Sequence, residues 1–176
     1  MSAEQQDGQS LRDSEMRYRR LFETAQDGIL ILDAGSGVVR NVNPFLMDML
    51  GCSRDDIIGK KLWEMGFFKD VQRSRDAFLR LQTEGYVRYE DLPLERKDGS
   101  GFDVEFISNV YLVGDERVIQ CNIRDITARK QMEDALRFLV SCGDTPPGED
   151  FFRALARYLG ESLGMYFVCI DRLEGD

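Results

Sequence analysis

Residues 102–127 read FDVEFISNVYLVGDERVIQCNIRDIT, the pattern of two long strands that fold back on each other. Near its start, apolar or small side chains alternate with Asp103 and Glu105, as in a strand with one buried face. Residues 114–116, Gly-Asp-Glu, form a turn signal before a second apolar strand at 117–124. Alternation predicts that the side chains opposite the two acids point into a core: Phe102, Val104, Phe106 and Ser108.

Upstream of this hairpin, a third strand at 86–96 ends in the turn Lys97-Asp-Gly99. Two earlier runs, 28–33 and 38–42, are β-branched or apolar and are separated by Gly35-Ser-Gly37. Helical patterns fill the space between these strands. Two strands followed by helices and then by three antiparallel strands indicate an α+β fold, with a five-stranded antiparallel sheet and helices on one face.

Helical segments flank this predicted domain on both sides. Residues 11–25 carry an apolar stripe that includes Tyr18, Leu21 and Phe22. A helix from 125 to about 140 carries Met132, Leu136 and Leu139, at the spacings of four and three that a coiled-coil seam requires. Both apolar stripes need to be buried against a partner, which favours a parallel homodimer. Ordinary helix packing explains the short C-terminal pattern equally well. An amphipathic helix at 149–163 and an apolar strand at 165–171 complete the pattern.

Composition excludes several classes of function. The formal net charge is −9, so the chain repels phosphate backbones and we expect no nucleic-acid partner. No apolar run approaches the roughly 20 residues of a membrane span, so we expect no membrane insertion. The chain has no histidine, which excludes histidine-ligated haem and a histidine-based catalytic triad within it. The cysteines are widely spaced, which favours a reduced, cytoplasmic setting. We therefore expect a chain that is not itself an enzyme.

Four short motifs resemble those of the PAS domain family. They are RYRRLFETAQDGI at 17–29, the Asn-Pro-Phe, Leu-Gly and Ile-Gly-Lys steps within 43–60, ERKDG at 95–99, and RDIT at 124–127. Their order and spacing make the resemblance specific over about residues 17–130. It implies a sensory, signal-transducing module and not a self-contained catalyst.

The resemblance also implies a domain organisation. Residues 1–10 are expected to be a disordered leader, and 11–130 a PAS sensory domain with its N-terminal helix. Residues 126–145 are expected to form a signalling or coiled-coil helix. Residues 146–176 resemble the truncated start of a GAF domain. In such proteins an output domain of the same polypeptide follows, usually the histidine kinase of a two-component system.

PAS domains enclose a cavity between the sheet and the helices. By similarity, this cavity would be lined by Leu30, Leu32, Leu46, Leu62, Phe78, Leu94, Val104, Phe106, Ile119, Cys121 and Ile123. Leu62 stands where flavin-binding relatives place their reactive cysteine. Leu94, Val104 and Ile123 stand where those relatives have polar groups that hold the ring. We therefore expect no flavin and no haem. If the cavity takes a ligand, we expect a small apolar one, such as an apolar acid or a lipid fragment. The alternative is a filled core in a structural dimerisation module.

The last motif, Asp125-Ile126-Thr127, lies where the final strand meets the following helix. Asp125 and Thr127 carry oxygens that can cap that helix, and this is the plain interpretation. The resemblance implies more, namely that these three residues pass a distortion of the sheet to the helix.

Overall fold

The computed structural model describes residues 3–68, 71–142, 149–163 and 168. The chain divides into two units, residues 1–126 and residues 127–176, and each is considered by itself. Within the described ranges, no helix is both long enough and apolar enough to cross a membrane.

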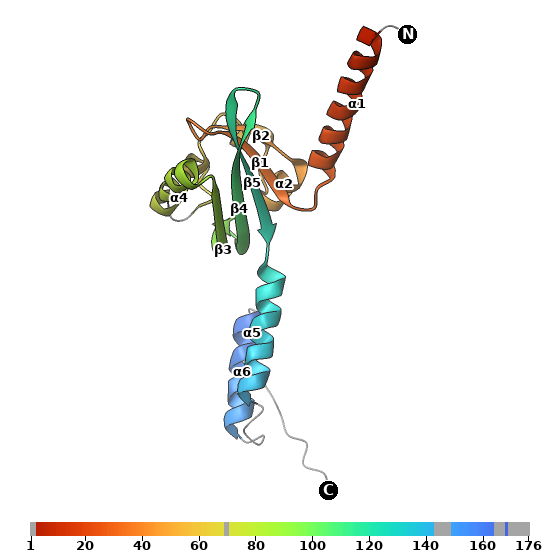
Figure 1. The fold of residues 1–176 in the computed structure, drawn as a ribbon. Coiled ribbons are helices and arrows are strands. Elements are labelled where there is room, and N and C mark those ends of the chain that lie inside the picture. Colours follow the sequence, from red (N-terminus) through yellow and green to blue (C-terminus); the bar gives the residue numbers. More distant parts are fainter. Residues whose placement is uncertain (1–2, 69–70, 143–148, 164–167, 169–176) are drawn as a thin grey trace. The chain divides into compact units, whose positions relative to one another are not determined.

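The first unit is built on the predicted five-stranded sheet (Figure 1). Its strands are β1 (Gly28–Asp33), β2 (Val39–Val42), β3 (Tyr86–Glu95), β4 (Gly101–Val113) and β5 (Glu116–Asp125). They lie in the order β2-β1-β5-β4-β3, and each neighbouring pair is antiparallel. The expected α+β fold is thus confirmed. The last strand, β5, lies at the centre of the sheet, between β1 and β4.

Side-chain alternation buries one face of the sheet, as predicted. Phe102, Val104, Phe106 and Ser108 of β4 are all buried. Glu105 is only 9% exposed although its side chain points to the opposite face of the sheet. Its carboxylate accepts hydrogen bonds from the Arg88 guanidinium on the neighbouring strand, and this ion pair compensates for the burial.

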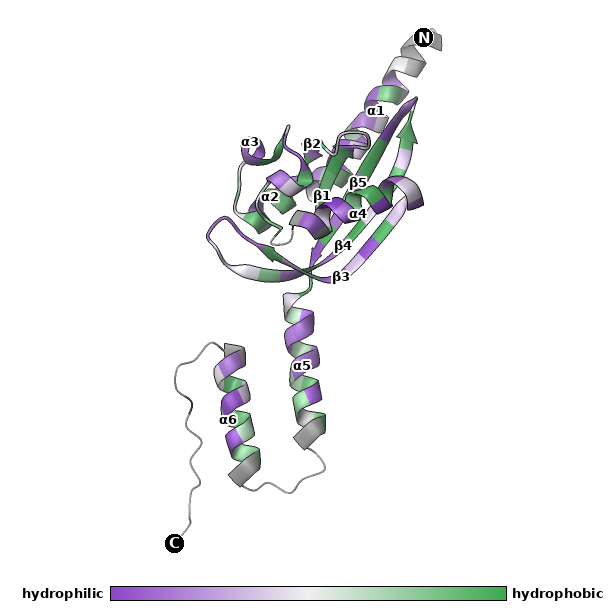
Figure 2. Ribbon diagram, turned by 90° about the vertical axis from the view of Figure 1, so that its left-hand side faces the viewer, coloured by the Kyte–Doolittle hydropathy of each residue, from purple (hydrophilic) through white to green (hydrophobic). Residues whose placement is uncertain are grey.

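Three helices and one 3-10 turn connect β2 to β3 and cover the buried face of the sheet. They are α2 (Pro44–Leu50), α3 (Arg54–Ile57), η1 (Leu62–Glu64) and α4 (Val71–Glu84). Helix α2 begins at Pro44, because the Asn43 side chain caps it and proline suits the first turn. In Figure 2 the residues of β1 are mostly hydrophobic, whereas the short peripheral helix α3 is mostly hydrophilic. The core therefore lies between the sheet and these helices.

The N-terminal helix is longer than we expected. Helix α1 spans Ala3–Thr24, so residues 3–10 are helical, and the prediction of a disordered leader at 1–10 is wrong for them. Residues 1–2 lie outside the described part of the chain. Extending a helix that the apolar stripe has already nucleated requires little free energy, since Ala, Glu and Gln all propagate helices well.

The second unit contains two helices, α5 (Thr127–Cys142) and α6 (Glu149–Leu163). The bounds of α6 agree with the helix predicted at 149–163, and α5 begins two residues later than the helix predicted from 125 to about 140. The rings of Phe138 and Tyr158 stack with centroids 4.6 Å apart, which joins α5 to α6. The strand predicted at 165–171 lies outside the described residues, apart from residue 168.

Candidate functional site

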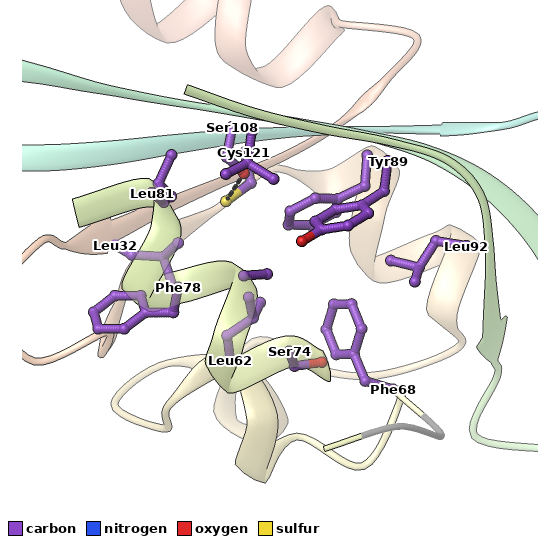
Figure 3. Close-up of a pocket in the computed structure, with 13 residues that line it drawn as sticks. Leu32, Leu62, Phe68, Ser74, Phe78, Leu81, Tyr89, Leu92, Ser108 and Cys121 are labelled. Atoms are coloured by element: carbon purple, nitrogen blue, oxygen red, sulfur yellow. Dashed lines mark hydrogen bonds between the residues drawn. The ribbon is translucent and has the colours of Figure 1, made fainter. Parts of the chain in front are cut away.

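A small cavity lies between the sheet and α4 (Figure 3). Leu62, Ser74 and Phe78 approach it from the helical side, while Tyr89, Ser108 and Cys121 come from the strands. Its volume is about 30 Å³. The lining residues are Leu32, Leu62, Phe68, Ser74, Ala77, Phe78, Leu81, Val87, Tyr89, Leu92, Phe106, Ser108 and Cys121. We refer to this space as the cavity.

An irregularity in β3 shapes one wall of the cavity. The pairing of β3 with β4 shifts register between Tyr89 and Leu92, which is a β-bulge. Asp91 within the bulge has φ of 61°, a left-handed conformation that aspartate tolerates better than most residues. Because of the extra residue, Tyr89 and Leu92 both line the cavity although they are three positions apart.

The half of the sheet under α2 is packed more tightly. A Cβ atom placed on Gly28 of β1 would lie 2.7 Å from Leu46 Cδ1 and 3.2 Å from the Ile123 carbonyl oxygen. Only a residue without a side chain therefore fits between β1 and α2. The cavity lies instead under α4, where several aromatic side chains meet the sheet.

A buried polar pair lies in the cavity wall. Ser108 of β4 and Cys121 of β5 are cross-strand partners, and the Ser108 hydroxyl donates a hydrogen bond to Cys121 Sγ over 2.9 Å. Both side chains are buried. Burial raises the pKa of the Cys121 thiol to about 12, against a smaller opposite effect of the Ser108 hydrogen bond. The sulfur is therefore a protonated thiol at neutral pH, and a poor nucleophile.

The single tryptophan of the chain stands beside the cavity. The Trp63 ring lies edge-on to Phe78, with centroids 5.3 Å apart, and Phe78 lines the cavity. Gly37 lies close to both rings, since a Cβ atom there would be 3.1 Å from the indole and 3.2 Å from Phe78. The fluorescence of Trp63 is thus placed to report on movements of the cavity wall.

Arg96, in the connection between β3 and β4, contacts the C-terminal end of β5. Arg96 Nη2 lies 3.3 Å from Asp125 Oδ2, and Arg96 Nε donates to the Met49 carbonyl of α2 over 3.0 Å. The guanidinium also lies over the Phe102 ring, 4.0 Å from its centroid. One side chain therefore contacts α2, β4 and the end of β5.

The other predicted signalling residues follow directly. Ile126 is buried, and its N–H donates to the Asp103 carbonyl oxygen over 2.9 Å. Thr127 is the first residue of α5. Asp125 itself is the last residue of β5, so it ends the strand and lies two positions before the helix.

A second ion pair connects the start of the sheet to the end of β5. Arg124 donates two hydrogen bonds to the carboxylate of Asp27, of 2.9 and 2.7 Å. This contact holds the pKa of Asp27 below its ordinary value. Asn43, which is fully buried, donates from Nδ2 to the Asp27 carbonyl over 2.9 Å and accepts from the N–H of Ile29. The residues around Asp27 therefore link β1, the start of α2 and β5.

The structure separates the predicted pocket residues into two groups. Leu32, Leu62, Phe78, Phe106 and Cys121 line the cavity. The other six residues are buried in the packed core and do not line it: Leu30, Leu46, Leu94, Val104, Ile119 and Ile123. These six residues therefore lie in the packed core beside the cavity, and near Gly28 the approach of Leu46 and Ile123 leaves no room even for a Cβ atom.

Several lining residues were missed as pocket residues. Ser108 was assigned to the buried face by alternation but was not counted as lining the cavity. Ser74 and Leu81 share a helical face with Phe78, so the period of α4 could have found them. Tyr89 and Leu92 could not have been found from alternation, because the bulge between them breaks the period.

The predicted dimer residues differ in exposure. Leu21 of α1 is 73% exposed and Tyr18 is also exposed, whereas Phe22 is only 8% exposed. The Tyr18 ring stacks on Phe22, with centroids 5.9 Å apart. In α5, Met132 and Leu136 are exposed, and the side chain of Leu139 lies outside the described set. Phe22 therefore belongs to the interior of the first unit and not to a free helical face.

Within the described residues, no three acidic or cysteine side chains come close enough together to hold a metal ion. The lining of the cavity offers hydroxyls and one thiol as its polar groups. Leu62, which the family resemblance places where flavin-binding relatives have their reactive cysteine, is part of that lining.

Comparison with known proteins agrees with this architecture. The sequence profile of the PAS domain matches residues 26–128. A PAS domain of an HTR-like protein from Haloarcula marismortui is 26% identical, with a TM-score of 0.60, over 69% of this chain and 99% of that one. A domain of a sensory box sensor histidine kinase/response regulator from Geobacter sulfurreducens is 27% identical, with a TM-score of 0.52, over 64% of this chain and 95% of that one.

A curated relative is also similar in sequence. It is the methyl sulfide methyltransferase-associated sensor of Methanosarcina acetivorans, 27% identical over 128 residues, which are 73% of this chain. The matched part is 13% of the length of that sensor. The similarity therefore concerns one region of a much longer protein.

Proposed function

Because the chain belongs to the PAS domain family, we propose that it senses a small molecule in the cavity and relays its presence through α5 to an output domain of the same polypeptide. The family and its relatives in sensor kinases support the sensory part. We propose both the binding of a ligand and its relay through α5 in addition to that sensory role.

The main support for this proposal is that a single strand, β5, runs from the cavity to the start of the exit helix. Cys121 of β5 lines the cavity, and Asp125 ends the same strand. A strand is nearly inextensible, so a displacement at Cys121 is passed along β5 to Asp125. Arg96 contacts Asp125 and also α2, so the end of the strand is held by both layers of the domain. The orientation in which α5 leaves the domain would depend on these contacts.

The wider setting is proposed on the same basis. The output domain is a histidine kinase, since the Geobacter relative is part of one. Residues 146–176 begin a GAF-like domain. Two copies associate in parallel through the exposed residues Tyr18 and Leu21 of α1 and through the seam of α5, as a coiled coil. The free thiols of Cys52 and Cys121 fit a cytoplasmic location.

The size of the cavity favours a second candidate. At about 30 Å³ it has room for roughly two water molecules. A structural dimerisation module with a filled core needs no more space than that. Native mass spectrometry of the purified protein separates the two functions, because only a sensor retains or takes up a molecule in the cavity.

The relay is tested in the full reading frame that contains this chain. Asp125→Ala and Thr127→Ala should each uncouple the stimulus from the output activity, while a melting curve shows that the domain stays folded. Asp115→Ala, in the exposed turn after β4, is the matched control. A normal response to stimulus in both variants would contradict the relay.

A further inference from the structure

The cavity restricts the charge of any ligand. Among the lining side chains that the structure describes, none carries a charge at neutral pH. The Arg80 guanidinium interacts with the lining residue Tyr89 but is already paired with Glu84. A carboxylate or an ammonium group moved into such surroundings therefore loses its hydration without gaining a free counter-ion, and a small apolar body does not recover that loss. A ligand of this cavity is therefore uncharged, which excludes an ionised apolar acid.

The cavity also restricts the size of the ligand. Its volume of about 30 Å³ corresponds to a few heavy atoms at most. A larger molecule would displace lining side chains such as the rings of Phe68 or Phe78 (Figure 3). A ligand of about four heavy atoms exceeds the room for two water molecules and fits only if the lining side chains shift, and larger ligands cost progressively more in packing.

One polar pair offers the ligand a hydrogen bond. The Ser108 hydroxyl donates to Cys121 Sγ, and sulfur is a weak acceptor. A carbonyl or ether oxygen is a stronger acceptor, so a ligand that carries one would take the Ser108 donor from the sulfur. The two other lining residues with hydroxyl groups, Ser74 and Tyr89, already take part in other interactions.

We propose that the cavity selects small uncharged molecules with one oxygen acceptor, and that the Ser108 hydroxyl recognises this oxygen by leaving Cys121. The inference rests on the proposed sensory function and names the ligand class of that site. Ser108 and Cys121 are cross-strand partners in β4 and β5. The exchange of hydrogen bonds therefore takes place on the strand that ends at Asp125, which joins recognition to the relay.

Three probes test the proposal on the full chain, and each has four heavy atoms in the same planar arrangement. Acetone carries an uncharged acceptor, isobutene replaces the oxygen by carbon, and acetate carries a charge. Amide chemical shifts of residues 108 and 121 and the fluorescence of Trp63 report binding. We expect acetone to bind with a millimolar Kd, because a few heavy atoms set a low ceiling on affinity. Acetate should not bind at concentrations at which acetone saturates the cavity.

Three variants separate the role of the Ser108 hydroxyl from that of the cavity volume. Ser108→Ala should weaken acetone about tenfold, since the bound oxygen loses its donor, and should leave isobutene unchanged. Cys121→Ala removes the competing sulfur, so acetone should bind at least as tightly as to the wild type. Ser53→Ala, which removes a hydroxyl outside the cavity, should change neither affinity.

The outcomes distinguish this inference from the proposed function beneath it. Equal binding of acetone to the wild type and to Ser108→Ala would overturn the role of the hydroxyl and leave the cavity as a ligand site. Acetate binding as well as acetone would overturn the selection for uncharged molecules. Failure of all three probes to shift any lining residue would instead contradict the ligand-binding function itself. If Ser108→Ala does not fold, weakened acetone binding to Cys121→Ala overturns the exchange.

Discussion

Arg96 and Asp125 are 29 positions apart in the sequence, yet Arg96 Nη2 lies 3.3 Å from Asp125 Oδ2. Both side chains are partly exposed to solvent. The same guanidinium contacts the Met49 carbonyl and the Phe102 ring, so it is fixed by groups other than the carboxylate. Arg96 therefore keeps two of its three contacts when Asp125 changes.

Loss of the charge at Asp125 should accordingly affect stability little. Asp125→Asn is expected to lower the free energy of unfolding by less than about 1 kcal/mol, because partly exposed ion pairs contribute little. Urea unfolding followed by circular dichroism measures this, with Asp115→Asn as the control of equal charge. A loss well above 2 kcal/mol would show that Asp125 is a structural residue of the core unit.

Asp27 predicts a dependence of stability on pH. Its hydrogen bonds from Arg124 lower the pKa of Asp27 in the folded chain, so below about pH 4 the unfolded chain binds more protons at this position. The contribution of Asp27 is therefore present above the unfolded pKa and is lost as pH falls through the lower folded value. We expect wild type to be more stable than Asp27→Asn at pH 6, with the difference shrinking towards pH 3. A difference independent of pH would contradict this assignment.

Gly37 and Gly35 form a matched pair in the β1–β2 connection. Gly37 has φ of 73°, and a Cβ atom there would lie 3.1 Å from the Trp63 ring and 3.2 Å from Phe78. Gly37→Ala should cost at least about 1–2 kcal/mol from the left-handed backbone, and should also shift the fluorescence of Trp63. At Gly35 the added Cβ meets only Asp33 Oδ1 at 3.4 Å, so Gly35→Ala should be nearly neutral. Equal thermal denaturation of the two variants would refute the close packing at Gly37.

The proposed dimer requires the exposed stripes of α1 and α5. Leu21→Glu combined with Leu136→Glu should shift sedimentation equilibrium at high micromolar concentration from dimer towards monomer, because like charges would face each other at the seam. Leu79→Glu is the control, since Leu79 is also an exposed leucine but lies on α4. A wild-type chain that sediments as a monomer would contradict the dimer directly.

Much of the fold was predictable from the sequence because its strands obey simple alternation. Phe102, Val104 and Phe106 are separated by acids, so the buried face of β4 follows from period alone. The bulge at Asp91 could not be predicted, because one extra residue in a strand produces no recognisable sequence pattern. The burial of Glu105 depends on Arg88 of a neighbouring strand, which no local pattern reveals.

The candidate site was predictable only in part for a similar reason. The family resemblance identified which face borders a pocket, and Leu32, Phe106 and Cys121 do line it. Whether a buried residue lines a cavity or fills one depends on how closely a helix approaches the sheet. At Leu46 the approach to Gly28 leaves no space, whereas the aromatic residues of α4 and its neighbours leave a gap. Such distances arise from tertiary packing and are not encoded in local periodicity.

The central claim, that the state of the cavity is relayed to α5, can be tested without knowing the ligand. Ala77→Leu adds carbon atoms to the cavity and stands in for a bound molecule, while Leu79→Ala on the same helix is exposed and serves as control. The decisive measurement is amide hydrogen exchange of residues 127–142 in Ala77→Leu, with and without Asp125→Asn. We predict that filling the cavity changes exchange in 127–142 several-fold, and that Asp125→Asn abolishes this change. Altered exchange around the cavity, with 127–142 identical to wild type, would contradict the relay.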